Sequence, residues 1–119
     1  MSTIPAAEPH PPGRIDGQLA VRVVDDGREI VAHVTGDIDM ATCARLRDAI
    51  EPHLGLGQRM VLDLSEVTFM DSSCLGVLEH ARTTLTSDGG SLILRNPSRA
   101  TTRLLSLAGM NALFDIETG

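Results

Sequence analysis

The sequence predicts an α/β protein whose mixed β-sheet of four to five strands has helices packed against it. Residues 60–64 form an almost continuous apolar run, which is typical of a strand buried on both faces. Soon after this run the apolar residues change to helical spacing, at Cys74, Leu78, Ala81 and Leu85. Strand-like and helix-like segments then alternate to the end of the chain, which favours a sheet covered by helices.

The first half of the chain predicts a hairpin followed by a helix. Residues 19–24 alternate in polarity, residues 25–27 read Asp-Asp-Gly, and residues 30–34 form a second apolar run, so two antiparallel strands joined by a tight turn are expected. A helix is expected over residues 41–54, with one apolar face made of Cys43, Leu46, Ile50 and Leu54. Pro52 should kink its last turn or end the regular helix early.

The second half continues the alternation. After the strand at 60–64, a short connection ending at Asp71 should lead into a helix that begins at Ser72 and ends at Gly89-Gly90. Residues 91–95 are expected to form a strand. Asn96-Pro97-Ser98 supplies capping chemistry for a helix that carries Leu104, Leu105 and Ala108 and stops at Gly109. Residues 112–116 should form a short last strand.

Composition limits the class of protein. The chain has 119 residues, enough for one domain, and four of its six prolines lie in residues 1–17, which we expect to be a disordered tail before a folded domain at 18–119. The net charge is −6 and no basic run is present, which argues against nucleic acid or an anionic membrane as partner. No signal peptide or membrane-length apolar run is seen, so we expect a cytoplasmic protein with free thiols.

Ser72 is the residue that the strand–loop–helix pattern singles out. Backbone N–H groups at a helix start are unpaired, so a serine there is a good helix cap, and a phosphate on it would be well held. Asp71 lies beside it, and Asp37 and Asp39 follow the end of the preceding strand. Because the ends of parallel strands gather at one sheet edge, we expect these carboxylates to form an acidic rim around Ser72, although solvated loop residues are the simpler interpretation.

Enzyme signatures are weak in this chain. Ser72 and Ser73 lack the flanking glycines of a hydrolase nucleophile elbow, and no phosphate-binding loop exists because the sequence contains no lysine. The histidines are scattered, at His10, His33, His53 and His80. We therefore predict no catalytic residues, no metal site and no cofactor, with a small hydrolase as a distant alternative.

Two motifs resemble those of a known family. Residues 69–73, Phe-Met-Asp-Ser-Ser, with residues 75–77, Leu-Gly-Val, resemble the signature of bacterial anti-sigma factor antagonists, which have the STAS domain. Residues 35–39, Thr-Gly-Asp-Ile-Asp, resemble a second signature. The likeness runs from Leu19 to Ile116 and implies that 18–119 is a STAS domain, usually completed by another helix. The family's common residue at Cys74 is glycine.

The resemblance implies a binding switch. An unphosphorylated antagonist of this family binds an anti-sigma factor that is also a serine kinase and so releases a sigma factor. The kinase phosphorylates the serine that matches Ser72, the complex weakens, and a serine phosphatase restores it. We expect a monomer when free. The partner-binding rim implied here contains Asp37, Asp39, Asp71, Ser73, Cys74 and Gly76. A STAS subunit of a larger sensory assembly, with no sigma factor involved, is the alternative among binding modules.

The two cysteines give a further alternative, a thiol redox sensor on the same fold. Cys74 lies in the first turn of its helix, where the helix dipole stabilises a thiolate and nearby acidic residues oppose it. Cys43 lies in the first turn of the other helix, so the thiols meet if the two loops converge. A disulfide requires Cα atoms within about 7 Å of each other. The simpler interpretation is that both cysteines are small core residues.

Overall fold

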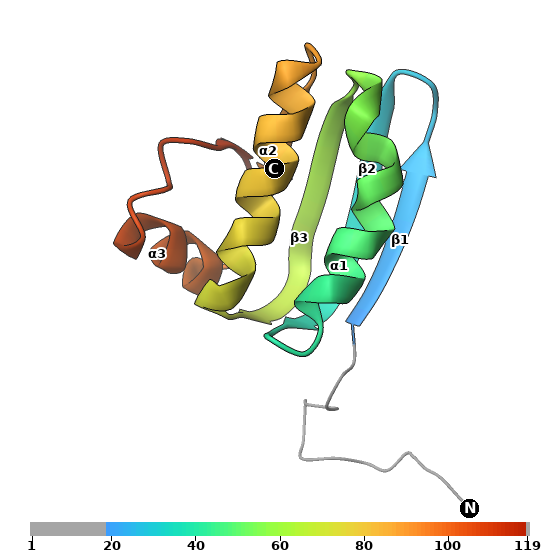
Figure 1. Ribbon diagram of the computed structural model, residues 1–119. Coiled ribbons are helices and arrows are strands. Elements are labelled where there is room, and N and C mark those ends of the chain that lie inside the picture. Colours follow the sequence, from blue (N-terminus) through green and yellow to red (C-terminus); the bar gives the residue numbers. More distant parts are fainter. Residues whose placement is uncertain (1–18, 119) are drawn as a thin grey trace, which may run out of the picture.

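The computed structural model describes residues 19–118, which form a five-stranded mixed sheet with the strand order β1-β2-β3-β4-β5 (Figure 1). β1 and β2 are antiparallel, and β2 through β5 are parallel to one another. This architecture confirms the predicted α/β class. The strands are β1 Leu19–Asp25, β2 Glu29–Ile38, β3 Arg59–Met70, β4 Ser91–Arg95 and β5 Asp115–Glu117. The expected tail at 1–17 lies outside the described residues.

Three α-helices connect the parallel strands: α1 Cys43–Ile50, α2 Leu75–Ser87 and α3 Arg99–Leu107. Helices α1 and α2 lie side by side on one face of the sheet (Figure 1). Alternate residues of each strand point from this face toward the two helices. The core that they form there with the helices is largely aliphatic. Its largest fully buried side chains include Ile30, Leu46, Ile50, Met60, Leu62, Leu64, Leu78 and Leu85. The sheet therefore holds the starts of α1 and α2 in fixed positions.

β3 is longer than predicted, and this is a correction. The connection expected after Leu64 is strand, and β3 pairs with β2 as far as Ile38↔Met70. Leu64 and Val67 are buried while the two residues between them are exposed, and the β2–β3 register shifts in this region. Such a bulge breaks the period of two on which a strand is recognised, so the sequence pattern ended the strand too early.

The expected helix at 41–54 is shorter and is followed by a different helix type. α1 covers Cys43–Ile50, and the 3₁₀-helix η1 covers Glu51–Leu56, with Pro52 in its first turn. Proline has no N–H to continue the α-helical hydrogen bonds, so the predicted early end of the regular helix is confirmed. The last strand is β5 at Asp115–Glu117, shorter and later than the expected 112–116. Ser98 caps α3 by accepting a hydrogen bond from Thr101 N at 3.1 Å, as expected.

Candidate functional site

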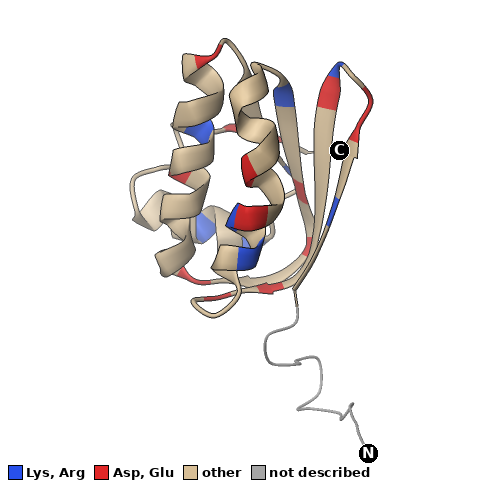
Figure 2. Cartoon of the chain, turned by 45° about the vertical axis from the view of Figure 1, so that its right-hand side comes forward, with Lys and Arg blue, Asp and Glu red and all other residues tan. Residues whose placement is uncertain are grey.

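The loops after β2 and β3 meet at one edge of the sheet. Asp71 N donates to Ile38 O at 2.8 Å, and Cys74 Sγ donates to Asp39 O at 3.3 Å. These bonds follow from the parallel pairing of β2 and β3, whose carboxyl ends lie together. Residues 37–43, which are the end of β2 and the segment after it, therefore lie beside residues 71–76, and the exposed side chains of both segments form one surface. Figure 2 shows acidic segments along this lower edge of the chain.

Ser72 lies exposed on this surface and is not the helix cap that the sequence suggested. Asp71 is the N-cap of the 3₁₀-turn η2, Ser72–Cys74, and its carboxylate accepts from Ser73 N at 2.8 Å. An extended residue one position earlier is better placed to cap a turn that already includes Ser72. Among the described residues the Ser72 hydroxyl has no hydrogen-bond partner. It stands free for a reaction at its oxygen.

The carboxylate of Asp39 is directed into its own loop. It accepts hydrogen bonds from Ala41 N at 2.9 Å and from Thr42 N at 3.0 Å, and it lies 3.1 Å from Thr42 Oγ1. A carboxylate that accepts several such bonds orders the turn before a helix. Asp39 thus shapes the surface beside Ser72 more than it presents charge to a partner.

Asp37 is also turned inward. It is 8% exposed, and its carboxylate accepts a hydrogen bond from Thr68 Oγ1. The sequence predicts three carboxylates around Ser72. That of Asp37 is bonded to Thr68 and that of Asp39 within its own loop. The half-buried Asp71, by contrast, lies next to Ser72 and caps its turn. The expected acidic rim is therefore narrower at the surface than the sequence pattern suggests.

Two residues that the sequence analysis did not single out shape the site. Thr42 is 1% exposed, and its Oγ1 donates to Asp37 O at 2.8 Å and accepts from Asp39 N at 2.9 Å. Met40 is held by this bonded loop and is 73% exposed. A threonine directly before a helix is a recognisable signal for capping. No comparable pattern marks an exposed methionine in a loop.

Gly76 lies exposed in the first turn of α2. A Cβ atom built on it meets nothing within 4 Å, so packing within the domain does not demand glycine there. Ser73, its neighbour across the turn, is exposed as well, and its Oγ lies 3.9 Å from Cys74 Sγ. Solvent therefore reaches both Ser73 and Gly76 on this side of Ser72.

Cys74 is fully buried, as its simpler interpretation as a core residue predicts, and the opposing effects on its thiol result in a raised pKa. Burial, and after it the neighbouring Cys43, raise the pKa of Cys74 to about 12, although a hydrogen bond with Ser73 acts to lower it. Desolvation outweighs the dipole because this side chain is enclosed by the core. Cys43 is partly exposed, and its backbone N donates to Asp39 O at 2.9 Å.

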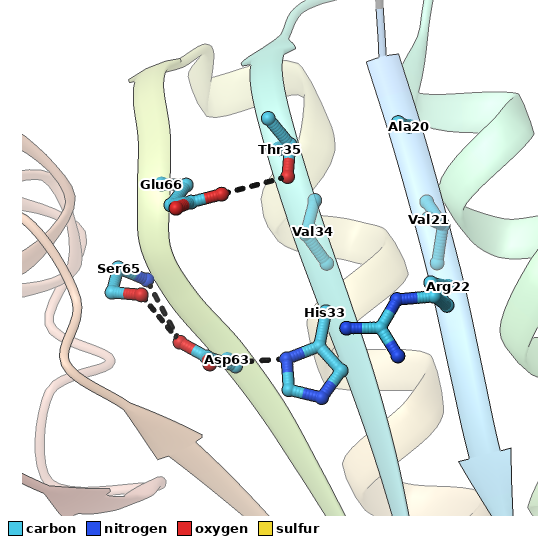
Figure 3. Close-up of a pocket in the computed structure, with 9 residues that line it drawn as sticks. All are labelled: Ala20, Val21, Arg22, His33, Val34, Thr35, Asp63, Ser65 and Glu66. Carbon is cyan, nitrogen blue, oxygen red and sulfur yellow. Dashed lines mark hydrogen bonds and ion pairs between the residues drawn. The ribbon is translucent and has the colours of Figure 1, made fainter.

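A separate hollow of about 440 Å³ lies on the sheet face opposite α1 and α2 (Figure 3). His33 Nδ1 lies 3.2 Å from Asp63 Oδ2, and Arg22 is the cross-strand neighbour of His33. Burial opposes ionisation of Asp63, but hydrogen bonds from Ser65 and His33 prevail and lower its pKa. This hollow shares no residue with the Ser72 surface.

No group of three metal-ligating side chains within residues 19–118 is placed to hold a metal ion. Across the same part of the chain, no helix has both the length and the apolar character needed to cross a membrane.

The sequence matches the family model described as Mlab, STAS domain, over residues 21–115. The chain belongs to the STAS domain family. A relative in Bacillus subtilis, named anti-sigma-B factor antagonist, is 31% identical over 98 residues, covering 82% of this chain and 90% of the relative. The STAS fold predicted from the two motifs is thereby confirmed.

Solved structures agree with this assignment. An anti-sigma factor antagonist from Mycobacterium paratuberculosis has a TM-score of 0.78 and 28% identity, covering 87% of this chain and 89% of that one. The unphosphorylated form of the anti-sigma factor antagonist SpoIIAA has a TM-score of 0.72 at 20% identity, covering 84% of this STAS chain and 88% of its own. The second likeness concerns the fold alone.

Proposed function

We propose that this STAS protein is an anti-sigma factor antagonist. Its unphosphorylated form binds an anti-sigma factor that is also a serine kinase, and a sigma factor is released. Phosphorylation of Ser72 switches the binding off, and a serine phosphatase restores it. The chain itself catalyses no step of this cycle, and the role places it in the cytoplasm. The names of its relatives support the antagonist role in this proposal.

The observation that carries the proposal is the position of the Ser72 hydroxyl. It is exposed, it follows a capping aspartate, and it has no hydrogen-bond partner among the described residues. A kinase can therefore reach the oxygen without unfolding the turn. Ser73 is exposed too, but its backbone N–H is fixed by Asp71 and its hydroxyl lies against Cys74, so Ser72 is the better acceptor.

Charge explains the switch. A phosphate adds about −1.5 to −2 charges at neutral pH. It would stand beside Asp71 on a chain whose net charge is already −6. A partner surface that is complementary to the uncharged hydroxyl has no room for the phosphate. If that surface carries acidic groups, the phosphate also repels it. The exposed side chains of Met40, at 73%, and Phe69, at 43%, supply apolar contact area near the same edge.

The test uses the full chain immobilised in its unphosphorylated form and a lysate of the source cells. We expect retention of a protein with serine kinase activity, its release on addition of ATP, and one phosphate on Ser72 by intact mass and peptide mapping. Ser72→Ala should keep the partner bound in the presence of ATP. Ser73→Ala is the matched control and should behave as the wild type does.

Two outcomes would contradict the proposal. Phosphate found only on Ser73 or on a threonine would remove Ser72 as the switch. Retention of a large assembly of STAS proteins with no kinase activity would favour a sensory subunit instead. Ser72→Asp is expected to weaken binding in part, because one carboxylate carries less charge than a phosphate.

A further inference from the structure

Two cysteines, one at the start of each of two helices, donate to the same backbone carbonyl, Cys43 through its backbone N–H and Cys74 through its thiol. Asp39 O accepts from Cys43 N at 2.9 Å and from Cys74 Sγ at 3.3 Å. The side chain of Cys43 also lies near enough to the Cys74 thiol to help raise its pKa. Cys43 begins α1, and Cys74 ends the 3₁₀-turn that precedes α2. The fold therefore brings together the two cysteines of the chain, which the proposed function does not use.

We propose that Cys43 and Cys74 are a thiol pair that a hydroperoxide converts into a reversible intramolecular disulfide. The two side chains differ in access, which assigns their order. Cys43 is partly exposed and meets the oxidant first. Cys74 is fully buried and is shielded from an oxidant in solution, so it reacts second, with the oxidised Cys43. This modification does not depend on Ser72 or on any partner of the protein.

The chemistry balances in two steps. In the first, the Cys43 sulfur attacks the peroxide oxygen; an S–O bond forms, the O–O bond breaks, and an alcohol leaves with the thiol proton. In the second, the Cys74 sulfur attacks the Cys43 sulfur; the S–S bond forms, the S–O bond breaks, and the hydroxyl leaves with the Cys74 proton as water. Two thiols are oxidised, and one hydroperoxide is reduced to an alcohol and water.

The environment of Cys74 makes the second step slow. Its burial keeps the pKa near 12, so the group is a thiol and not a thiolate at neutral pH. The proximity of the two cysteines at the Asp39 carbonyl compensates, because the reaction is intramolecular and needs no diffusion of a second reactant. In the folded protein Cys43 should accept a maleimide reagent while Cys74 stays unmodified.

The consequence of the bond falls at the Ser72 surface. Cys74 lies two positions after Ser72, and Cys43 follows the loop that exposes Met40. A disulfide would join these two loops covalently. Because it would also restrict the unfolded chain, the oxidised protein should melt at a higher temperature than the reduced protein.

The test treats the purified, reduced full chain with hydrogen peroxide, then denatures it and adds excess maleimide. We expect monomeric protein that has lost two hydrogen atoms and carries no maleimide, a joined Cys43–Cys74 peptide, and full return to two adducts after dithiothreitol. Cys43→Ser and Cys74→Ala should each abolish the joined peptide. Cys43→Ser alters a partly exposed site and remains informative even if Cys74→Ala folds poorly.

Other outcomes overturn the proposal. Conversion of Cys43 to a sulfinic acid while Cys74 keeps its thiol would show that the second sulfur does not reach the first. Disulfides found only between two chains, or both thiols intact after sustained peroxide, would do so equally.

Discussion

Replacing the buried Thr42 tests how the loop beside Ser72 is held. Thr42→Val keeps the shape of the side chain but removes the hydroxyl. The carbonyl of Asp37 then loses a bond of 2.8 Å, and the amide of Asp39 loses one of 2.9 Å. The carbonyl of the buried Asp37 and the amide of Asp39 each lose a hydrogen-bond partner. Valine offers neither a donor nor an acceptor in its place.

The expected cost is about 2 kcal/mol, since leaving a buried polar group unsatisfied costs ~1–3 kcal/mol and the Asp37 carbonyl has a second lone pair. In a domain of this size that corresponds to a fall in Tm of roughly 10 °C. Thr42→Ser is the matched control, because it keeps the hydroxyl and loses only a methyl group. It should cost less than about 1 kcal/mol.

The assay is urea and thermal unfolding followed by circular dichroism, together with amide hydrogen exchange. Thr42→Val should lower the urea midpoint without changing the slope, and the Asp39 amide should exchange faster than in Thr42→Ser. If valine and serine both unfold within about 0.5 kcal/mol of the wild type, the hydroxyl does not hold this loop and the reasoning is refuted.

Three further predictions concern the fold. Gly90→Ala should destabilise the domain strongly, because its Cβ would lie 2.2 Å from Gln58 O, whereas Gly55→Ala, with nothing within 4 Å, should be nearly neutral in the same unfolding assay. The pKa of Asp63 is lower folded than unfolded, so its contribution to stability should be present at neutral pH and disappear as pH falls from about 5 toward 2; Asp63→Asn should flatten that part of the pH profile of urea midpoints. Leu62→Ala, at a fully buried position of the central strand, should cost about 2–5 kcal/mol; a loss under 1 kcal/mol would mean that the core is not packed there.

The sequence predicted which loops meet but not which carboxylates they expose. The parallel order of β2 and β3 follows from the alternation of strands and helices, and it places Asp37 and Asp39 near Asp71. The inward hydrogen bonds of Asp37 depend on Thr68, which faces it only because of the bulge in β3. A pattern with a period of two cannot anticipate a bulge, so this pairing required the structure.

The cysteines illustrate a second limit. A first-turn position predicts a lowered pKa through the helix dipole, whereas burial predicts a raised one. The size of the second effect depends on how completely neighbouring side chains enclose the sulfur. Cys74 is 0% exposed, so burial dominates. Sequence periodicity placed Cys74 on the apolar face of its helix but could not supply that degree of enclosure.

The last prediction concerns what a phosphate on Ser72 would do to the shape of the site, on the proposed function. Two bonds hold the two loops together, Asp71 N–Ile38 O and Cys74 Sγ–Asp39 O, and a third, Ser73 N–Asp71 Oδ1, orders the turn at Ser72. None of these bonds involves the Ser72 hydroxyl. Adding a phosphate therefore breaks no bond of this network. We expect amide exchange across residues 37–43 to change less than threefold on phosphorylation, while partner affinity falls by far more. The switch would then act by charge and bulk on a preformed surface. Faster exchange throughout this loop after phosphorylation would instead indicate that the loops separate, and a purely electrostatic account would fail.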